Sequence, residues 1–121
     1  MEAAELRHWA KIKARTGKAC VYRRNGVDRN LTLVPASPRR SQTGENDFTV
    51  SAIDKTFIGG TAELRDAGLH PPKRDDRITL NDAGGVAETY QVTSDANDDL
   101  WRPMGNYGAM VRINAKRVKT T

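Results

Sequence analysis

Short segments in which apolar and polar residues alternate, separated by glycine, proline and asparagine, constrain the fold of this chain more than any other feature. An alternation of period two places one set of side chains on one face of a β-strand, so it indicates half-buried strands. The predicted strands are 18–24, 29–35, 47–53, 76–80, 86–93 and 109–118. Asn25-Gly26 supplies residues that accept a positive φ, which predicts a hairpin turn within a four-residue connection between the first two strands.

Two further stretches are predicted to be helical. Residues 2–16 carry large apolar side chains three residues apart, which form a narrow stripe on one side of a helix. These positions are Leu6, Trp9 and Ile12. So narrow a stripe must dock on another surface, and the sequence leaves open whether that is the chain's own barrel or a neighbour. Residues 62–67 are predicted to form a short helix, with Thr61 as its cap and Gly68 as its stop.

The order of these elements favours one domain over residues 1–121, a length typical of single domains. We expect a mainly β fold, a small antiparallel β-barrel or sandwich with an N-terminal helix and one short crossing helix. The helix occupies 1–17 and the barrel 18–118, with long polar loops at 37–46 and 94–108.

The apolar content predicts a thin core. Leu, Ile, Val and Phe number 22 of the 121 residues. That fraction lies just under the roughly 20% at which disorder becomes a serious alternative. Because the strand patterns are clear, we interpret the chain as a folded subunit whose burial is completed by neighbouring copies.

Charge is distributed unevenly along the chain. The net charge of +5 divides into +7 over residues 1–40, −7 over 41–100 and +5 over 101–121. A dedicated duplex-DNA binder concentrates basic residues with little acid beside them, so this two-signed pattern argues against one. Opposite charges on one chain instead favour contacts between copies that fix their register.

The residues that carry catalytic or metal chemistry are sparse. Cys20 is the single cysteine, without a partner for a disulfide or a nearby base, and we expect it to be buried. His8 and His70 are isolated, and Asp75-Asp76 would point to opposite sides of an extended chain. We therefore expect neither an enzyme, nor a cofactor, nor a metal site. No apolar run approaches a membrane span, and the N-terminus lacks a secretion signal, so we expect a cytoplasmic origin.

Binding of single-stranded nucleic acid is an alternative function for a small barrel. Such modules interleave exposed aromatic rings with basic residues. The best candidates here are Tyr22, Arg23 and Arg24, followed by Trp101 with Arg102. The competing interpretation packs Trp101 under its loop and places Tyr22 on a sheet face.

The second half of the chain carries a recognisable arrangement of residues. It has a proline, two aspartates before an apolar strand, a glycine-rich turn and then Tyr-x-Val on the returning strand. The residues concerned are Pro72, Asp75, Asp76, Ile78, Gly84, Gly85, Tyr90 and Val92, preceded by Asp47, Phe48 and Val50 and followed by Trp101, Arg102, Gly108, Arg112, Ile113 and Lys116. This arrangement resembles the head-completion proteins of tailed bacteriophages, also called head-tail joining, neck or stopper proteins. Asp75 stands where that family usually has glycine, which accepts a positive φ more readily than aspartate.

The resemblance implies a virion structural protein without catalytic activity. Members form β-barrel-like subunits that assemble as a six- or twelvefold ring, with a portal or adaptor above and a tail protein below. The ring closes the filled head, lines the channel for double-stranded DNA without sequence specificity, and sits in the neck after assembly in the host cytoplasm. On this interpretation Arg39, Arg40, Trp101 and Arg102 are candidate subunit or docking contacts. Tail terminators and other neck components carry similar patterns and remain alternatives.

Overall fold

The computed structural model describes residues 2–36, 53–81, 87–94, 99–105 and 107–118. Its elements in chain order are α1 (Glu2–Thr16), β1 (Lys18–Arg24), β2 (Val27–Ala36), β3 (Lys55–Gly60), α2 (Thr61–Asp66), β4 (Arg77–Asn81), β5 (Ala87–Val92), β6 (Trp101–Met104) and β7 (Met110–Val118). The predicted fold class is confirmed, and the barrel rather than the sandwich is formed.

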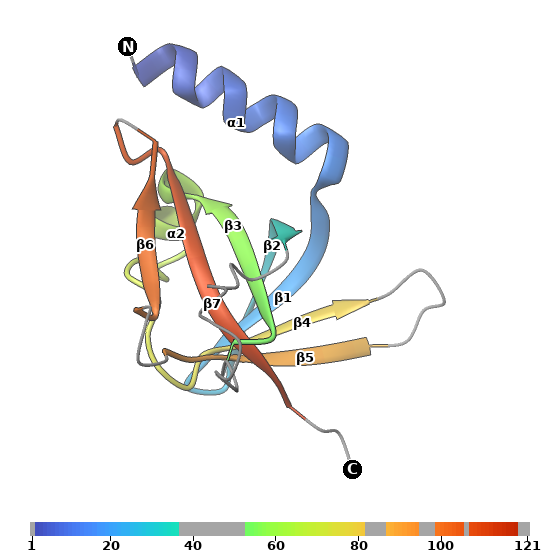
Figure 1. The fold of residues 1–121 in the computed structure, drawn as a ribbon. Helices are drawn as coiled ribbons and strands as arrows, with labels where there is room; N and C mark the ends of the chain where they lie inside the picture. Colours follow the sequence, from blue (N-terminus) through green and yellow to red (C-terminus); the bar gives the residue numbers. More distant parts are fainter. Residues whose placement is uncertain (1, 37–52, 82–86, 95–98, 106, 119–121) are drawn as a thin grey trace, which may run out of the picture.

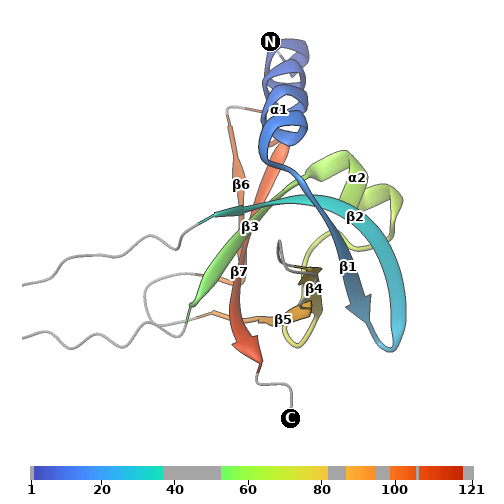
Figure 2. The same ribbon diagram turned by 90° about the vertical axis from the view of Figure 1, so that its right-hand side faces the viewer.

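Six antiparallel strands close into the barrel in the order β3-β2-β1-β4-β5-β7, and pairing of β3 with β7 completes the circle. Closure removes the free sheet edges that would invite pairing with other chains. Strand β2 bends sharply over the barrel and pairs with β1 along one part and β3 along another (Figure 2). Strand β6 lies outside the circle, next to β7.

The β1–β2 hairpin forms where the sequence predicts it. Asn25 and Gly26 both have positive φ values, 53° and 79°, and Arg24 pairs directly with Val27. The connection is therefore two residues long, not the four predicted, because β2 begins at Val27. Two consecutive positive φ values match the right-handed twist of the strands that they join.

The barrel interior holds the main core. Its fully buried large side chains include Tyr22, Leu33, Phe57, Leu64, Ile78, Val92, Val111 and Ile113. Phe57 and Tyr90 meet edge to face, with their ring centroids 5.4 Å apart. Leu64 reaches this core from α2, so the short helix covers one end of the barrel.

Helix α1 crosses the same end of the molecule as α2 and the turn between β6 and β7, opposite the C-terminus (Figure 1). It packs on its own barrel, through a second and smaller cluster. That cluster consists of Trp9, Val34 and Met110, with Ile12, Ile58 and Met104 packed against it. Leu6, predicted to share the apolar stripe, is instead 43% exposed.

Several expectations differ from the structure. Residues 94–108 are not a continuous loop, because β6 forms within them and pairs with β7. Strand β3 is not among the predicted strands, and Gly59 and Gly60 form its end. The strand predicted at 47–53 lies outside the described residues, apart from Ile53, and so does the whole of the 37–46 loop.

The predicted helix ends also differ in part. Thr61 does not cap α2 but is its first residue, and its hydroxyl donates to the Gly108 carbonyl. Gly68 does stop the helix as expected, with a φ of 75° that glycine accepts without strain.

Candidate functional site

The turn before β4 carries the aspartate pair that the resemblance singled out. Asp75 adopts a φ of 74°, the left-handed conformation that glycine favours. Aspartate is among the few other residues that tolerate this conformation. Its carboxylate also accepts a hydrogen bond of 2.6 Å from Gln91, which holds the turn against β5. The departure from glycine at this position therefore leaves the turn intact.

Asp76, the next residue, is turned inward and is only 3% exposed. Its Oδ2 accepts hydrogen bonds from the Tyr22 hydroxyl at 2.6 Å and from an Arg24 terminal nitrogen at 2.8 Å. The Lys73 backbone N–H donates to the same oxygen at 2.9 Å. A buried carboxylate is costly unless it is paired and hydrogen-bonded, and Asp76 meets both conditions.

Arg24 extends this network to the backbone of the segment that precedes β4. Its guanidinium donates to the carbonyl oxygens of Gly68, Leu69 and Pro71 at 2.9 to 3.2 Å. Arg24 thus fastens the segment between α2 and β4 to β1. The hydrogen bond to Asp76 raises the pKa of Arg24, whereas burial and then the Asp76 hydrogen bond raise the pKa of Tyr22. Both shifts keep Tyr22 protonated and Arg24 positively charged, the states in which each donates to Asp76.

A second carboxylate, Glu63 on α2, holds helix α1. Its Oε1 accepts from the Trp9 indole N–H at 3.1 Å and from the Lys13 ammonium at 2.8 Å. Gly60 makes room for this contact, since a Cβ there would lie 2.7 Å from Trp9 Nε1 and 2.9 Å from Glu63 Oε1. At the other end of α1, Glu5 accepts from the backbone N–H groups of Tyr107 and Ala109. Helix α1 is therefore attached at both ends.

The residues predicted to contact nucleic acid do not share a surface. Tyr22 is fully buried, so its ring offers no face for a base to stack on. Arg23 points outward and donates to Asp28 at 2.6 Å, whereas Arg24 is committed to Asp76. Because side chains alternate along β1, Arg23 lies on the opposite face of the strand from Tyr22 and Arg24.

The candidate docking residues divide between described and undescribed parts. Trp101 and Arg102 lie on β6, while Arg39 and Arg40 lie outside the described residues. Trp101 is half-buried against the core, and its ring meets His70 edge to face with centroids 5.1 Å apart. The Arg102 side chain is exposed. Trp101 thus packs β6 against the core, and Arg102 faces outward.

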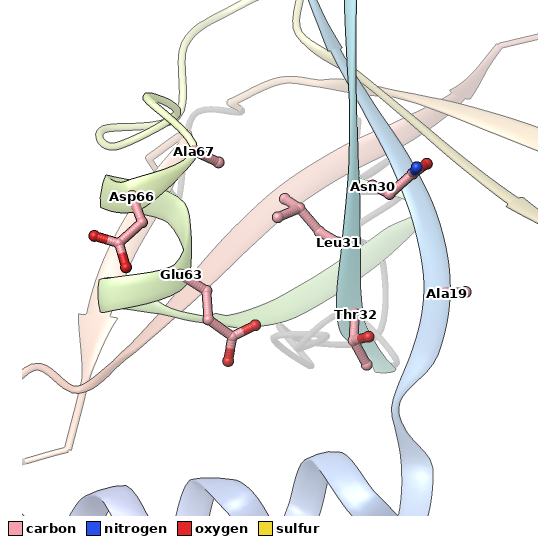
Figure 3. A pocket seen from close by; sticks show the side chains of 7 residues that line it. All are labelled: Ala19, Asn30, Leu31, Thr32, Glu63, Asp66 and Ala67. Carbon is pink, nitrogen blue, oxygen red and sulfur yellow. The ribbon is translucent and has the colours of Figure 1, made fainter.

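A groove lies between α2 and the β1–β2 hairpin, with a volume of about 550 Å³ (Figure 3). Its lining is Ala19, Asn30, Leu31, Thr32, Glu63, Asp66 and Ala67. Asp66 and Glu63 come from one turn of α2, and the apolar part comes from Ala19, Leu31 and Ala67. The sequence showed neither the groove nor the role of Glu63, because their parts come from segments more than 30 positions apart.

The described residues offer no evident reaction chemistry. Among them, no group of three His, Cys, Asp or Glu residues could hold a metal ion. Burial raises the pKa of the Cys20 thiol to about 11, so it stays protonated at neutral pH. Within the same residues, no helix is both long and apolar enough to cross a membrane.

Fold and contacts together define a class: a small closed β-barrel with a helix fixed across one end and an outer strand. The chain belongs to the phage head-tail joining protein family, whose model matches residues 1–121, the whole chain. The resemblance stated from the sequence is thereby confirmed. The family is structural, so the protein has a structural role in the neck of the virion and associates with other phage head and tail proteins. Comparison with curated proteins finds no match.

Proposed function

We propose that residues 1–121 act as one subunit of a ring of six or twelve copies beneath the portal or adaptor. The ring closes the filled head, lines the channel through which double-stranded DNA leaves, and provides the surface on which the tail attaches. The observation that carries this proposal is the family match along the whole chain. Within the described residues, the carboxylates of Asp76 and Glu63 hold distant segments of the fold together, which suits a structural subunit.

Two pairs of residues are assigned to docking in this proposal. The outer strand β6 presents Arg102 beside the packed Trp101, and we assign both to contacts with a neighbour or the tail. We assign Arg39 and Arg40 to the same kind of contact, since dense positive charge inside the channel would hinder DNA passage. The subunits are assembled in the host cytoplasm, where the single Cys20 stays reduced.

Electron microscopy of the source virion tests the proposal. We expect a ring of this chain between the portal or adaptor and the tail. If the neck density contains no such ring, the proposal is wrong. A phage that lacks the gene should yield separate tails and filled heads that lose their DNA. Tails assembled without heads distinguish the alternative, because a tail terminator is present on them and a head-completion protein is absent.

A further inference from the structure

Helix α1 has a second face that its contacts with the barrel leave unused. Glu5, Trp9 and Lys13 hold the helix and lie four residues apart, so they share one side. The opposite side carries Arg7, Lys11 and Arg15, also four apart, and all three are exposed. With a rise of about 1.5 Å per residue, these cations follow one another roughly every 6 Å along the helix.

This basic row lacks an acidic partner within the described residues, where each ion pair involves other side chains. It is bordered by small side chains, since Ala10 and Ala14 are exposed beside it. Small residues let another chain approach the helix closely. The row therefore fits a surface that offers carboxylates together with a shallow apolar area.

The groove beside α2 offers this chemistry on the same molecule. Asp66 lines it, together with Leu31, Ala67 and Glu63, whose carboxylate already accepts from Trp9 and Lys13 of its own molecule (Figure 3). Asp66 is exposed, and within the described part of the chain it makes no ion pair. Lysine and arginine bury their aliphatic stems on apolar surface while the charged head meets an acid, so such a groove suits them.

We propose that the basic row of α1 (Arg7, Lys11 and Arg15) docks into the α2 groove of a second copy of this chain. The row faces away from its own barrel, and within the described residues it makes no ion pair with Asp66 or Glu63 of the same molecule. Row and groove are different surfaces, which makes the contact head-to-tail, and such contacts close into a ring when the rotation permits. This inference rests on the proposed ring and names the surfaces that join neighbouring subunits.

Cysteine cross-linking in assembled particles tests the contact. The double variant Lys11→Cys with Asp66→Cys places one thiol on each surface, while native Cys20 is buried and does not interfere. On mild oxidation we expect a ladder of multimers, about tenfold more abundant than for either single variant, because docking holds the thiols in proximity. Val27→Cys with Asp66→Cys is the matched control, since Val27 is exposed and begins β2 at the β1–β2 turn, the end of β1 that lies far from α1. Absence of a ladder from particles that contain the double variant overturns the proposal.

Charge reversal tests the chemistry. Asp66→Lys should weaken incorporation into particles. Lys11→Glu in the same chain should restore it, because positions 11 and 66 then again carry opposite charges where neighbouring subunits meet. Asp28→Lys makes the same charge change elsewhere and should leave incorporation unchanged. If Lys11→Glu alone blocks incorporation but Asp66→Lys has no effect, the row binds a different partner and the proposal is wrong. The ring itself stands or falls by microscopy of the native neck, so the two failures are distinguishable.

Discussion

Two carboxylates in this protein each join segments that lie 50 or more positions apart, yet they do so in different surroundings. Asp76 ties β1 to the turn before β4 from a position in which its side chain is 4% exposed. Glu63 ties α1 to α2 with a side chain that is 36% exposed. Attraction between charges is much stronger away from water, and loss of a buried partner is correspondingly more costly. The first contact is therefore part of the barrel, and the second attaches a helix to a barrel that is already complete.

Asp76→Asn should have the largest effect. It removes the negative charge and replaces one acceptor oxygen with an amide NH₂ group, so the Tyr22 hydroxyl and the Arg24 guanidinium lose the charged acceptor that they share. Breaking one side of a buried pair typically costs about 3–5 kcal/mol in the free energy of unfolding, which chemical denaturation measures. Asp28→Asn is the control, because Asp28 pairs with Arg23 on the surface and little change is expected. Equal effects of the two substitutions would contradict the distinction drawn here.

Trp9→Ala should have the next largest effect, confined to α1. Trp9 is 4% exposed and fills the small cluster with Val34 and Met110. Its truncation should lower the free energy that holds α1 on the barrel by about 3 kcal/mol. This is the lower end of the range for truncating large buried aromatic side chains. Hydrogen exchange should show α1 amides losing protection while the barrel strands keep theirs. Leu6→Ala on the same helix is the control, and an equal loss there would mean that α1 docks with a different face.

The local patterns of the sequence were sufficient for most elements of the fold. Strand β1 and helix α1 have the predicted bounds, because alternation and helical spacing are properties of neighbouring residues. Strand β6 was missed because Pro103 and its polar surroundings look like a loop. Its residues become a strand only through pairing with β7, which is a tertiary contact.

The glycines at the end of β3 show the same limit. Gly59 and Gly60 end β3, where both are buried and lie against other side chains. Because glycine has no side chain, Leu33 lies close to Gly59 and Trp9 lies close to Gly60. The spacing of residues in the sequence does not reveal these contacts. In the site, Asp76 was noticed through the family resemblance. Its partners Tyr22 and Arg24 lie more than 50 positions away, and the sequence offers them only as candidates for the alternative nucleic-acid function.

Tyr22→Phe should weaken the Asp76 network without breaking it, since Arg24 and the Lys73 N–H still donate to the carboxylate. We expect a loss of about 1.5 kcal/mol at neutral pH, typical of a hydrogen bond to a charged group. Because folding raises the pKa of Tyr22, its stabilising contribution is complete below the unfolded pKa near 10 and decreases as the pH rises further. The difference in unfolding free energy between the two proteins should therefore narrow above about pH 10. A constant difference across the alkaline range would contradict this account.

Lys13→Met should have the smallest effect, and it tests the exposed side of the comparison. The ammonium lies 2.8 Å from Glu63, but both side chains are about one-third exposed to water. Such pairs contribute about 0.5 kcal/mol, and salt screens them. Helix α1 should stay attached through Trp9, with a small loss of amide protection that disappears at roughly 1 M salt. Lys11→Met on the outer face should leave protection of α1 unchanged. Lys13→Met could instead release the helix as fully as Trp9→Ala. That result would mean that Glu63 stabilises the attachment chiefly through its charge, despite its exposure to water.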